Sequence, residues 1–330
     1  MTGLYQEDFV NSLQRAIKPL LWQWQLSEQT RLTLLCLSEN ATFRADDPGR
    51  PNPLIIRAHR PGYHSRREII SELEWIKQLR SDGIVSTAQP VTTSSGEPLV
   101  TLDDAGEQRH LAAFEFLPGI EPNESGDLSE GFHELGETTA RLHQHAQQWR
   151  RPDTFTRKTW NFDTTIGDNP HWGDWRAALG LDNRGRRILQ RCCELLREQL
   201  HEYGQGLAHF GLIHADLRLA NLLVDGENLS VIDFDDCGFG WYLYDFAAAI
   251  SFFETSAQIP ALQQAWVAGY RQVAALDDAE VKKMPMFIML RRLLLTAWVA
   301  SHAETATAQE LGSGYTADTV SMAEAYLTNR

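Results

Sequence analysis

Apolar residues in the first third of the chain come in short alternating runs separated by turn residues. The segment 31–43 alternates and is rich in Leu and Thr, and the apolar run 54–59 follows the breakers DDPG and RPNP. Three further short runs have the same character: 90–95, 96–106 and 111–119. Alternation bounded by Gly, Pro and Asp is typical of strands joined by turns. We therefore expect a small antiparallel sheet in this part of the chain.

Helical spacing interrupts this pattern in two places. Residues 7–22 have the pattern of an amphipathic helix that ends near Pro19. The run 65–83 stops at Asp82-Gly83, and its apolar residues recur at helical spacing: Ile69, Leu73, Ile76 and Leu79. Such recurrence places apolar side chains on one face of a helix. We predict a helix in each segment.

Helical spacing dominates after the breaker Pro118-Gly119. The segments that show it are 128–149, 184–203, 242–255, 261–274 and 280–304, with a hairpin over 222–233 between them. At 330 residues the chain exceeds the usual size of one domain. A strand-rich beginning and a helix-rich remainder predict an α+β protein of two lobes, 1–117 and 118–330, with a cleft at their junction.

Composition and charge restrict the partners and the compartment. Hydrophobic residues make up 43% and charged residues 22%, and the formal net charge of -14 disfavours a nucleic-acid partner. The four cysteines form no CxxC pair and no zinc-type cluster, which predicts free thiols in a reducing cytoplasm. No basic and apolar leader opens the chain, and no apolar run approaches the roughly 20 residues of a membrane span. We expect a cytoplasmic protein with no membrane partner.

The apolar runs ANLLV and LSVIDF are separated by a strong hairpin signal, the dipeptide DG with its flanking polar residues. If Val224 faces Leu229 across the turn, the antiparallel register pairs Asn221 with residues near Ile232 and Asp233. Paired strands lie about 5 Å apart. This register therefore brings an amide oxygen and a carboxylate to one end of the hairpin.

Asp216 lies on the loop just before the hairpin and can overhang the same end. Its carboxylate would join Asn221 and Asp233, and three oxygen-bearing side chains at one point suit a hard cation such as Mg²⁺. Asp and Asn are also common in turns, and for Asp225 and Asn228 we prefer that role. The motif H-x-D-x-x-x-x-N, followed by a hairpin and I-D-F, indicates a metal site because spacing and context coincide.

The motifs H214-A-D216-L-R-L-A-N221 and V-I-D233-F resemble the H-G-D-x-x-x-x-N and h-h-D signature of the aminoglycoside phosphotransferase and choline kinase superfamily, which is kin to protein kinases. The pattern DFDDCGFGWYLYDFA is most similar to that of homoserine kinase of the second type and related bacterial kinases. The resemblance implies a bilobal protein-kinase-like fold. Its N-lobe would be a small antiparallel sheet, and its C-lobe would be larger and mostly helical.

The same resemblance assigns roles in the C-lobe. It implies that Asp216 is the catalytic base and that Arg218 contacts the transferred phosphate. Asn221 and Asp233 would hold Mg²⁺ against the β- and γ-phosphates of ATP. Asp245 would steady the catalytic loop. We expect His214 to be a hydrogen-bonded loop residue, and the helix histidines at 143 and 145 to be packing or surface residues.

In the N-lobe the resemblance implies that a strand cation, Arg57, grips the α- and β-phosphates. Glu72 on the following helix would orient it, with Glu68 as the alternative one turn earlier. Arg stands where relatives carry Lys, and a guanidinium can still bind a carboxylate or phosphate. The competing interpretation is an exposed strand Arg beside a charged helix.

The remaining nucleotide contacts are expected from backbone. A glycine-rich loop is absent, and LSENATFR stands in its place, so backbone groups of 38–42 would reach the phosphates. Ser38 and Asn40 are equally compatible with ordinary turn roles. AFEFLPG resembles the hinge between kinase lobes, where backbone from Glu115 to Leu117 would pair with adenine.

Acidic and aromatic residues after Asp233 are expected on the acceptor side: Asp235, Asp236, Trp241 and Tyr242. They suit a small amino alcohol or a polyamine-like cation, although a solvated acidic face has the same composition.

Three functions follow. The first is ATP- and Mg²⁺-dependent phosphorylation of a small-molecule hydroxyl, such as an amino alcohol like homoserine or an aminoglycoside-like compound. The second is a Ser/Thr protein kinase of the bacterial stress-response type, with a protein substrate. The third is a non-catalytic nucleotide-binding module, which the intact Asp216, Asn221 and Asp233 argue against.

Overall fold

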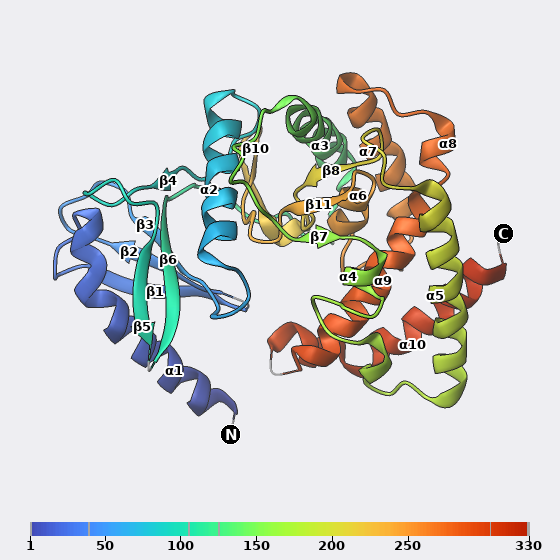
Figure 1. Ribbon diagram of the computed structural model, residues 1–330, viewed down its shortest axis with the longest axis horizontal. Helices are drawn as coiled ribbons and strands as arrows, with labels where there is room; N and C mark the ends of the chain where they lie inside the picture. The colour runs from blue at the N-terminus through green and yellow to red at the C-terminus, as the bar shows by residue number, and fades with distance from the viewer. Residues whose placement is uncertain (1, 39, 105, 125, 304, 329–330) are drawn as a thin grey trace. The chain divides into compact units, whose positions relative to one another are not determined.

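The computed structural model describes residues 2–38, 40–104, 106–124, 126–303 and 305–328 (Figure 1). The chain divides into two compact units. Unit 1 comprises residues 1–119 with 151–156, and unit 2 comprises 120–150 with 157–330.

Unit 1 is built on one antiparallel sheet, to which six strands contribute within the described residues. The strands are β1 (Arg31–Leu37), β2 (Ala41–Asp46), β3 (Leu54–Ala58), β4 (Pro90–Val91), β5 (Val100–Asp104) and β6 (Glu107–Glu115). Their order is β1-β2-β3-β6-β4, and β5 pairs with β6. The predicted antiparallel sheet is confirmed, and the alternating segment 31–43 contains the strand β1 and the start of the strand β2.

The core of unit 1 lies between the sheet and the N-terminal helices α1 (Thr2–Ile17) and η1 (Lys18–Trp24). Phe43, Ile56 and Leu111 point into it and are fully buried. Helix α1 ends at Ile17, close to Pro19 as predicted, and Pro19 stands in the opening turn of η1, where its missing N–H has no helical partner to lose.

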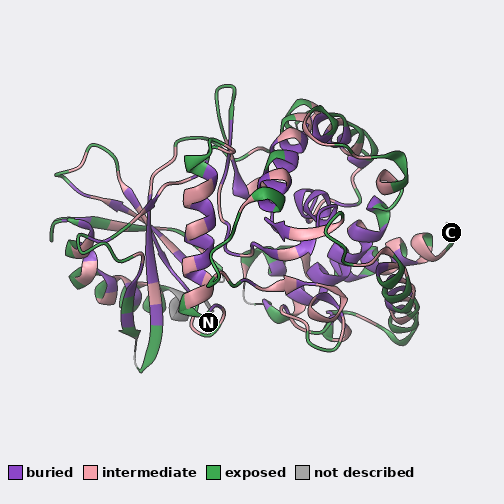
Figure 2. Ribbon diagram, turned by 45° about the horizontal axis from the view of Figure 1, so that its top comes forward, coloured by how far each residue is buried: buried purple, intermediate pink, exposed green. Residues whose placement is uncertain are grey.

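Helix α2 (Arg66–Ser81) begins with a capping box, because the Ser65 side chain accepts from the Glu68 N–H and the Glu68 carboxylate accepts from the Ser65 N–H. Its apolar face is buried as the spacing predicts: Ile69, Leu73, Ile76 and Leu79. Figure 2 shows the buried and exposed sides of this helix.

Unit 2 is mainly helical. Its helices are α3 (Ser129–Gln148), α4 (Phe162–Thr165), η2 (Trp175–Ala177), α5 (Asn183–Tyr203), η3 (Leu219–Asn221), α6 (Tyr244–Ala249), α7 (Ile259–Val273), α8 (Asp278–Val281), α9 (Met284–Ser301) and α10 (Ala306–Thr328). Its strands are β7 (Thr159–Trp160), β8 (Phe210–Ile213), β9 (Leu222–Asp225), β10 (Asn228–Val231) and β11 (Gly238–Trp241). They form a β10-β9 hairpin and a β7-β11-β8 sheet.

Helices α3 and α7 cross closely because glycines face the partner backbone. A Cβ on Gly269 would lie 1.8 Å from the His133 carbonyl oxygen, and a Cβ on Gly136 would lie 2.1 Å from that of Trp266. Only glycine permits this approach. Two predictions need correction: the helix expected over 242–255 spans only α6, which ends at Ala249, and α10 was not predicted.

Helix α9 is the central helix of unit 2 and is apolar on nearly every side. The stretch Asp278–Ser301 has the length and composition of a membrane span, which corrects the expectation that no apolar run reaches that length. However, 78% of its apolar window is buried inside the protein. Two arginines in this helix, Arg291 and Arg292, are each only 1% exposed.

Candidate active site

The hairpin of β9 and β10 has the predicted register. Val224 pairs with Leu229 across the turn. Beyond the strands, the Ile232 N–H donates to the Asn221 carbonyl oxygen at 2.9 Å. Asn221 is therefore held beside the residue that precedes Asp233, as the sequence predicted.

Asn221 and Asp216 are joined by hydrogen bonds that fix the amide orientation. The Asn221 Nδ2 donates to the Asp216 carbonyl oxygen at 2.8 Å and to its Oδ2 at 2.7 Å. Both partners are acceptors, so the nitrogen must face them and the amide oxygen must point elsewhere. That oxygen is the atom a cation would use.

Asp233 follows the hairpin in the left-handed region, with φ of 60°. A non-glycine residue seldom adopts this conformation, and such residues concentrate at functional sites. Its Oδ1 accepts from the Asp235 N–H at 3.4 Å. Within the described residues no group of three His, Cys, Asp or Glu side chains is arranged to hold a metal ion. One amide and one carboxylate still fit Mg²⁺, which takes few protein ligands and fills its shell with phosphate and water.

Two arginines contact the Asp216 carboxylate. Arg218 Nε donates to Oδ2 at 3.2 Å, and Arg291 Nη2 donates to Oδ1 at 2.5 Å. Burial raises the pKa of Asp216, but the guanidinium groups of Arg218 and Arg291 outweigh it and hold the pKa below its usual range. Asp216 is therefore an ionised carboxylate at neutral pH. Arg291 was not predicted, and the available signal was a pair of arginines inside an apolar helix.

Asp245 stabilises the loop that carries Asp216 through hydrogen bonds to its backbone. Its carboxylate accepts the N–H groups of His214 at 3.2 Å and Ala215 at 2.7 Å. His143 is not merely a packing or surface residue, because its Nε2 lies 3.0 Å from Asp245 Oδ2. Its Nδ1 lies 3.0 Å from the Tyr270 hydroxyl. His143, on a helix 102 positions earlier in the chain, thus helps to orient the Asp245 carboxylate that binds the loop.

In unit 1, Arg57 and Glu72 form a buried ion pair with Nη1 and Oε1 at 2.7 Å. The guanidinium of Arg57 also lies 4.9 Å from the centre of the Phe114 ring. Arg57 is only 8% exposed, which is inconsistent with an exposed strand arginine. Glu68, the alternative partner, instead caps α2 through Ser65.

The other predicted nucleotide contacts occupy ordinary backbone positions. The Ser38 N–H donates to the Asn40 carbonyl at 3.0 Å, and Asn40 Oδ1 accepts from the Arg60 N–H at 3.1 Å. Position 39, also in the predicted segment, lies outside the described residues. The Glu115 N–H donates to the Gln89 carbonyl, and Leu117 is half-buried beyond the end of β6.

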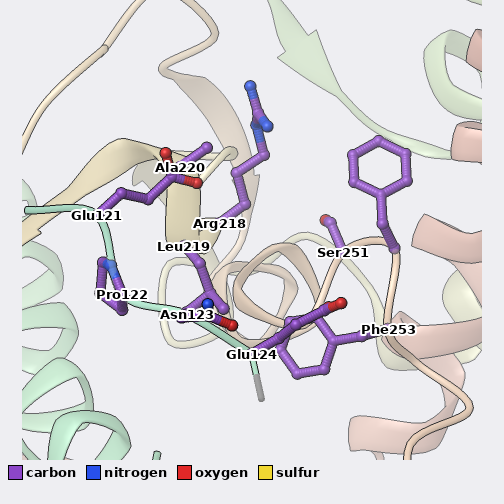
Figure 3. A pocket seen from close by; sticks show the side chains of 10 residues that line it. Glu121, Pro122, Asn123, Glu124, Arg218, Leu219, Ala220, Ser251 and Phe253 are labelled. Atoms are coloured by element: carbon purple, nitrogen blue, oxygen red, sulfur yellow. The ribbon is translucent and has the colours of Figure 1, made fainter. Parts of the chain in front are cut away.

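A cavity of about 400 Å³ in unit 2, here called the acceptor pocket, opens beside the loop that follows Asp216. It is lined by Glu121, Pro122, Asn123, Glu124, Arg218, Leu219, Ala220, Ser251, Phe252 and Phe253. Figure 3 shows Glu121 and Pro122 on one side, Ser251 and Phe253 on the other, and the Arg218 side chain rising between Glu121 and Ser251. The polar groups that converge here and the apolar rings are typical of a small-molecule site.

The acidic and aromatic residues predicted on the acceptor side do not line this pocket. Trp241 is 1% exposed and donates through Nε1 to the Gly204 carbonyl at 2.7 Å. Tyr242 is buried with its ring 4.7 Å from that of His143. The Asp235 carbonyl accepts from Arg157 and the Asp236 carbonyl accepts from Trp160 Nε1. The prediction is corrected for Trp241 and Tyr242, whose side chains are packed in the interior, and it stays a prediction for Asp235 and Asp236.

The chain belongs to the phosphotransferase enzyme family, whose model matches residues 37–276. It is similar to a solved microcompartment-associated aminopropanol kinase, with 43% identity, a TM-score of 0.87, and coverage of 94% of this chain and 96% of that one. A solved amicoumacin kinase in complex with AMP-PNP, Ca²⁺ and Ami has 23% identity, a TM-score of 0.77 and 93% coverage of each chain. The amicoumacin kinase of Bacillus subtilis (strain 168) is 24% identical over 74% of this chain and 72% of its own length.

These likenesses confirm two predictions. The fold is that of the protein-kinase-like phosphotransferases. The chain is a small-molecule kinase, which phosphorylates a hydroxyl group.

Proposed function

We propose that this kinase transfers the γ-phosphoryl group of ATP to the hydroxyl of a small amino alcohol, with Mg²⁺ as cofactor. One observation carries the proposal: Arg218 lines the acceptor pocket and also donates to Oδ2 of Asp216. The pocket therefore opens next to the carboxylate that would take the hydroxyl proton. The 43% identity to an aminopropanol kinase supports an amino alcohol as the acceptor.

The transfer step uses Asp216 as the base. The acceptor hydroxyl gives its proton to Asp216 while its oxygen forms a bond to the γ-phosphorus. The bond between that phosphorus and the oxygen bridging to the β-phosphate breaks, and ADP leaves with the electron pair. Because Asp216 is held by Asn221 and Arg291, little reorganisation precedes the transfer.

Asn221 and Asp233 would hold the Mg²⁺ ion, which when bound neutralises phosphate charge. We expect Asp233→Ala to reduce the Mg²⁺-dependent rise in Tm on adding ATP. A ligand that binds the folded state less tightly stabilises it less at the same concentration. Asp225→Ala is the matched control, because Asp225 lies exposed at the turn of the same hairpin. An equal ATP shift in wild type and Asp233→Ala would remove Asp233 from the metal site.

Unit 1 would bind the nucleotide through Arg57, which Glu72 holds in place. Backbone of 38–42 and of 115–117 would supply further phosphate and adenine contacts. The four cysteines form no disulfide, and three of them are buried, which supports the predicted cytoplasm. This part of the proposal rests on the buried cation at the strand position where the family resemblance places it.

Acceptor choice would depend on charge at one wall of the pocket. Glu121 and Glu124 bring two carboxylates to the pocket, and Phe252 and Phe253 bring aromatic rings to it from another segment. Carboxylates and ring faces both attract an ammonium group. A neutral alcohol of the same size lacks this attraction.

The test compares aminopropanol with propanediol, which replaces the amino group by a hydroxyl. We expect kcat/KM to favour aminopropanol by at least about tenfold, equivalent to roughly 1.4 kcal/mol. Glu121→Gln combined with Glu124→Gln should erase most of this preference, while Glu130→Gln on α3 should keep it. Equal turnover of both alcohols would contradict the amino-alcohol assignment. Label found only on protein would favour the protein-kinase alternative.

A further inference from the structure

Every nitrogen of the Arg291 guanidinium donates a hydrogen bond on or beside the loop that carries Asp216. Nη2 donates to Asp216 Oδ1 at 2.5 Å, and Nη1 donates to the Ala215 carbonyl at 3.2 Å. Nη1 also donates to the Tyr244 hydroxyl at 3.1 Å, and Nε donates to Ser251 Oγ at 3.1 Å. The planar fork of an arginine can serve four acceptors in this way, and an ammonium group cannot.

The peptide before Asp216 is held at both of its polar groups. Ala215 has a φ of 68°, a conformation that a residue with a side chain seldom adopts. Asp245 accepts the Ala215 N–H at 2.7 Å, and Arg291 donates to the Ala215 carbonyl at 3.2 Å. The family resemblance accounts for the first contact. The second comes from a helix that lies beyond the residues matched by the family model.

The two oxygens of Asp216 have different surroundings. Oδ1 accepts from Arg291, whose side chain is 1% exposed. Oδ2 accepts from Arg218, whose side chain is 35% exposed and lines the acceptor pocket, and from Asn221. An acceptor hydroxyl can replace the exposed arginine far more readily than the buried one.

We propose that Arg291 is a positioning residue for phosphoryl transfer: it holds Oδ1 and the strained Ala215 peptide so that Oδ2 faces the acceptor and takes its proton. This inference rests on the proposed function. Arg291 touches neither substrate nor the transferred group, and it acts through Asp216. Its loss should therefore reduce the rate of the chemical step and leave substrate affinity nearly unchanged.

Arg292 provides a matched control one position along the same helix. It is equally buried, and its three nitrogens donate to Glu254 at 2.6 Å, to Thr319 at 2.8 Å and to the Tyr315 carbonyl at 2.9 Å. Breaking either buried pair leaves an unpaired charge and destabilises the fold. Only Arg291 is bonded to Asp216, so the two substitutions separate positioning from stability.

The experiment measures kcat, the KM for ATP, the KM for aminopropanol and Tm for Arg291→Lys and Arg292→Lys. We expect Arg291→Lys to lower kcat about 100-fold, the scale of a small misplacement of a catalytic group, with each KM within about threefold. Arg292→Lys should lower Tm by a similar amount and keep kcat within about threefold. Tyr244→Phe is the substitute variant if Arg291→Lys fails to fold. It removes one acceptor of Arg291 without changing charge, and it should lower kcat several-fold.

Equal kcat in wild type and Arg291→Lys, or equal losses in both lysine variants, would overturn the inference. A crystal structure of Arg291→Lys gives a readout that needs no acceptor. We expect the Asp216 carboxylate to rotate and Ala215 to leave the left-handed region, and retention of both would overturn the inference. Failure of the proposed function would look different, since wild type itself would then leave aminopropanol unphosphorylated.

Discussion

In each unit a buried arginine–carboxylate pair contains a proposed site residue, and the functional member of the pair is the cation in one unit and the anion in the other. In unit 1 the Arg57 side chain is 9% exposed and its partner Glu72 is 0% exposed. In unit 2 the Asp216 side chain is 12% exposed and its partner Arg291 is 1% exposed. The proposed working group is the cation in the first pair and the anion in the second. In both pairs it is the less buried member.

This difference shows why an ion pair should not be interpreted from distance alone. The two pairs are similarly short, at 2.7 and 2.5 Å. A fully enclosed charge can only orient its partner, because a ligand cannot reach it, whereas a partly exposed charge can exchange its partner for a ligand. The comparison predicts unequal effects within each pair, with the larger loss at the more exposed residue.

The largest effect is expected at Asp216. Asp216→Asn keeps the shape of the side chain but removes the base, so kcat should fall by about 10²–10⁴-fold. The loss should exceed that of Arg291→Lys. Binding of ATP·Mg²⁺, measured by calorimetry, should change little. Asp225→Asn is the control, and a kcat for Asp216→Asn within tenfold of wild type would contradict the base assignment.

In unit 1 the larger loss should come from removing the arginine, and the smaller loss from changing its carboxylate partner. Arg57→Met removes the proposed phosphate ligand and should raise the KM for ATP about 100-fold, while Glu72→Gln should raise it about tenfold; charged hydrogen bonds of this strength span that range. Glu68→Gln weakens only the α2 cap, so it should lower Tm with an unchanged KM. A larger KM effect for Glu72→Gln than for Arg57→Met would break the comparison.

The sequence predicted local geometry well where a few neighbouring residues decide it. The DG turn sets the pairing of Val224 with Leu229, and this register carries Asn221 to the Asp233 end of the hairpin. The α2 helix follows in the same way from its capping box and its apolar spacing. Motif spacing then supplied the candidate site residues within this short stretch, and their roles stay predictions.

Long-range partners could not be predicted by the same reasoning. Arg291 lies 75 positions from Asp216, and His143 lies 102 positions from Asp245. Only packing reveals which apolar helix runs beneath the catalytic loop. Trp241 and Tyr242 were misplaced for the same reason, since an aromatic residue beside a site motif can equally fill the core. The end of α6 at Ala249 likewise has no glycine or proline to signal it.

The smallest effect concerns Asp47, a carboxylate of unit 1 that pairs with neutral donors instead of an arginine. It accepts the Ser27 N–H at 2.5 Å, the Thr30 hydroxyl at 2.6 Å and the Gly49 N–H at 2.7 Å. The Thr30 hydroxyl and the Ser27 N–H favour the charged form and hold the pKa of Asp47 well below its usual range. Because the folded-state pKa is depressed, its stabilising effect is complete above the usual aspartate pKa and is lost as pH falls toward the folded value.

Asp47→Asn should therefore lower Tm by a few degrees at pH 7 and at pH 5, and the difference from wild type should shrink as the pH falls below about 4, where the unfolded aspartate protonates. Its kcat and KM should stay within about twofold of wild type. Asp47 is buried, as Asp216 and Glu72 are, but its hydrogen bonds stabilise only a turn. Thermal unfolding across this pH range measures the effect. A Tm difference that stayed constant down to pH 3 would show that the hydrogen bonds do not depend on the charge. A loss of activity would show that the donors around a buried carboxylate do not reveal its role, and would weaken the interpretation of both arginine pairs.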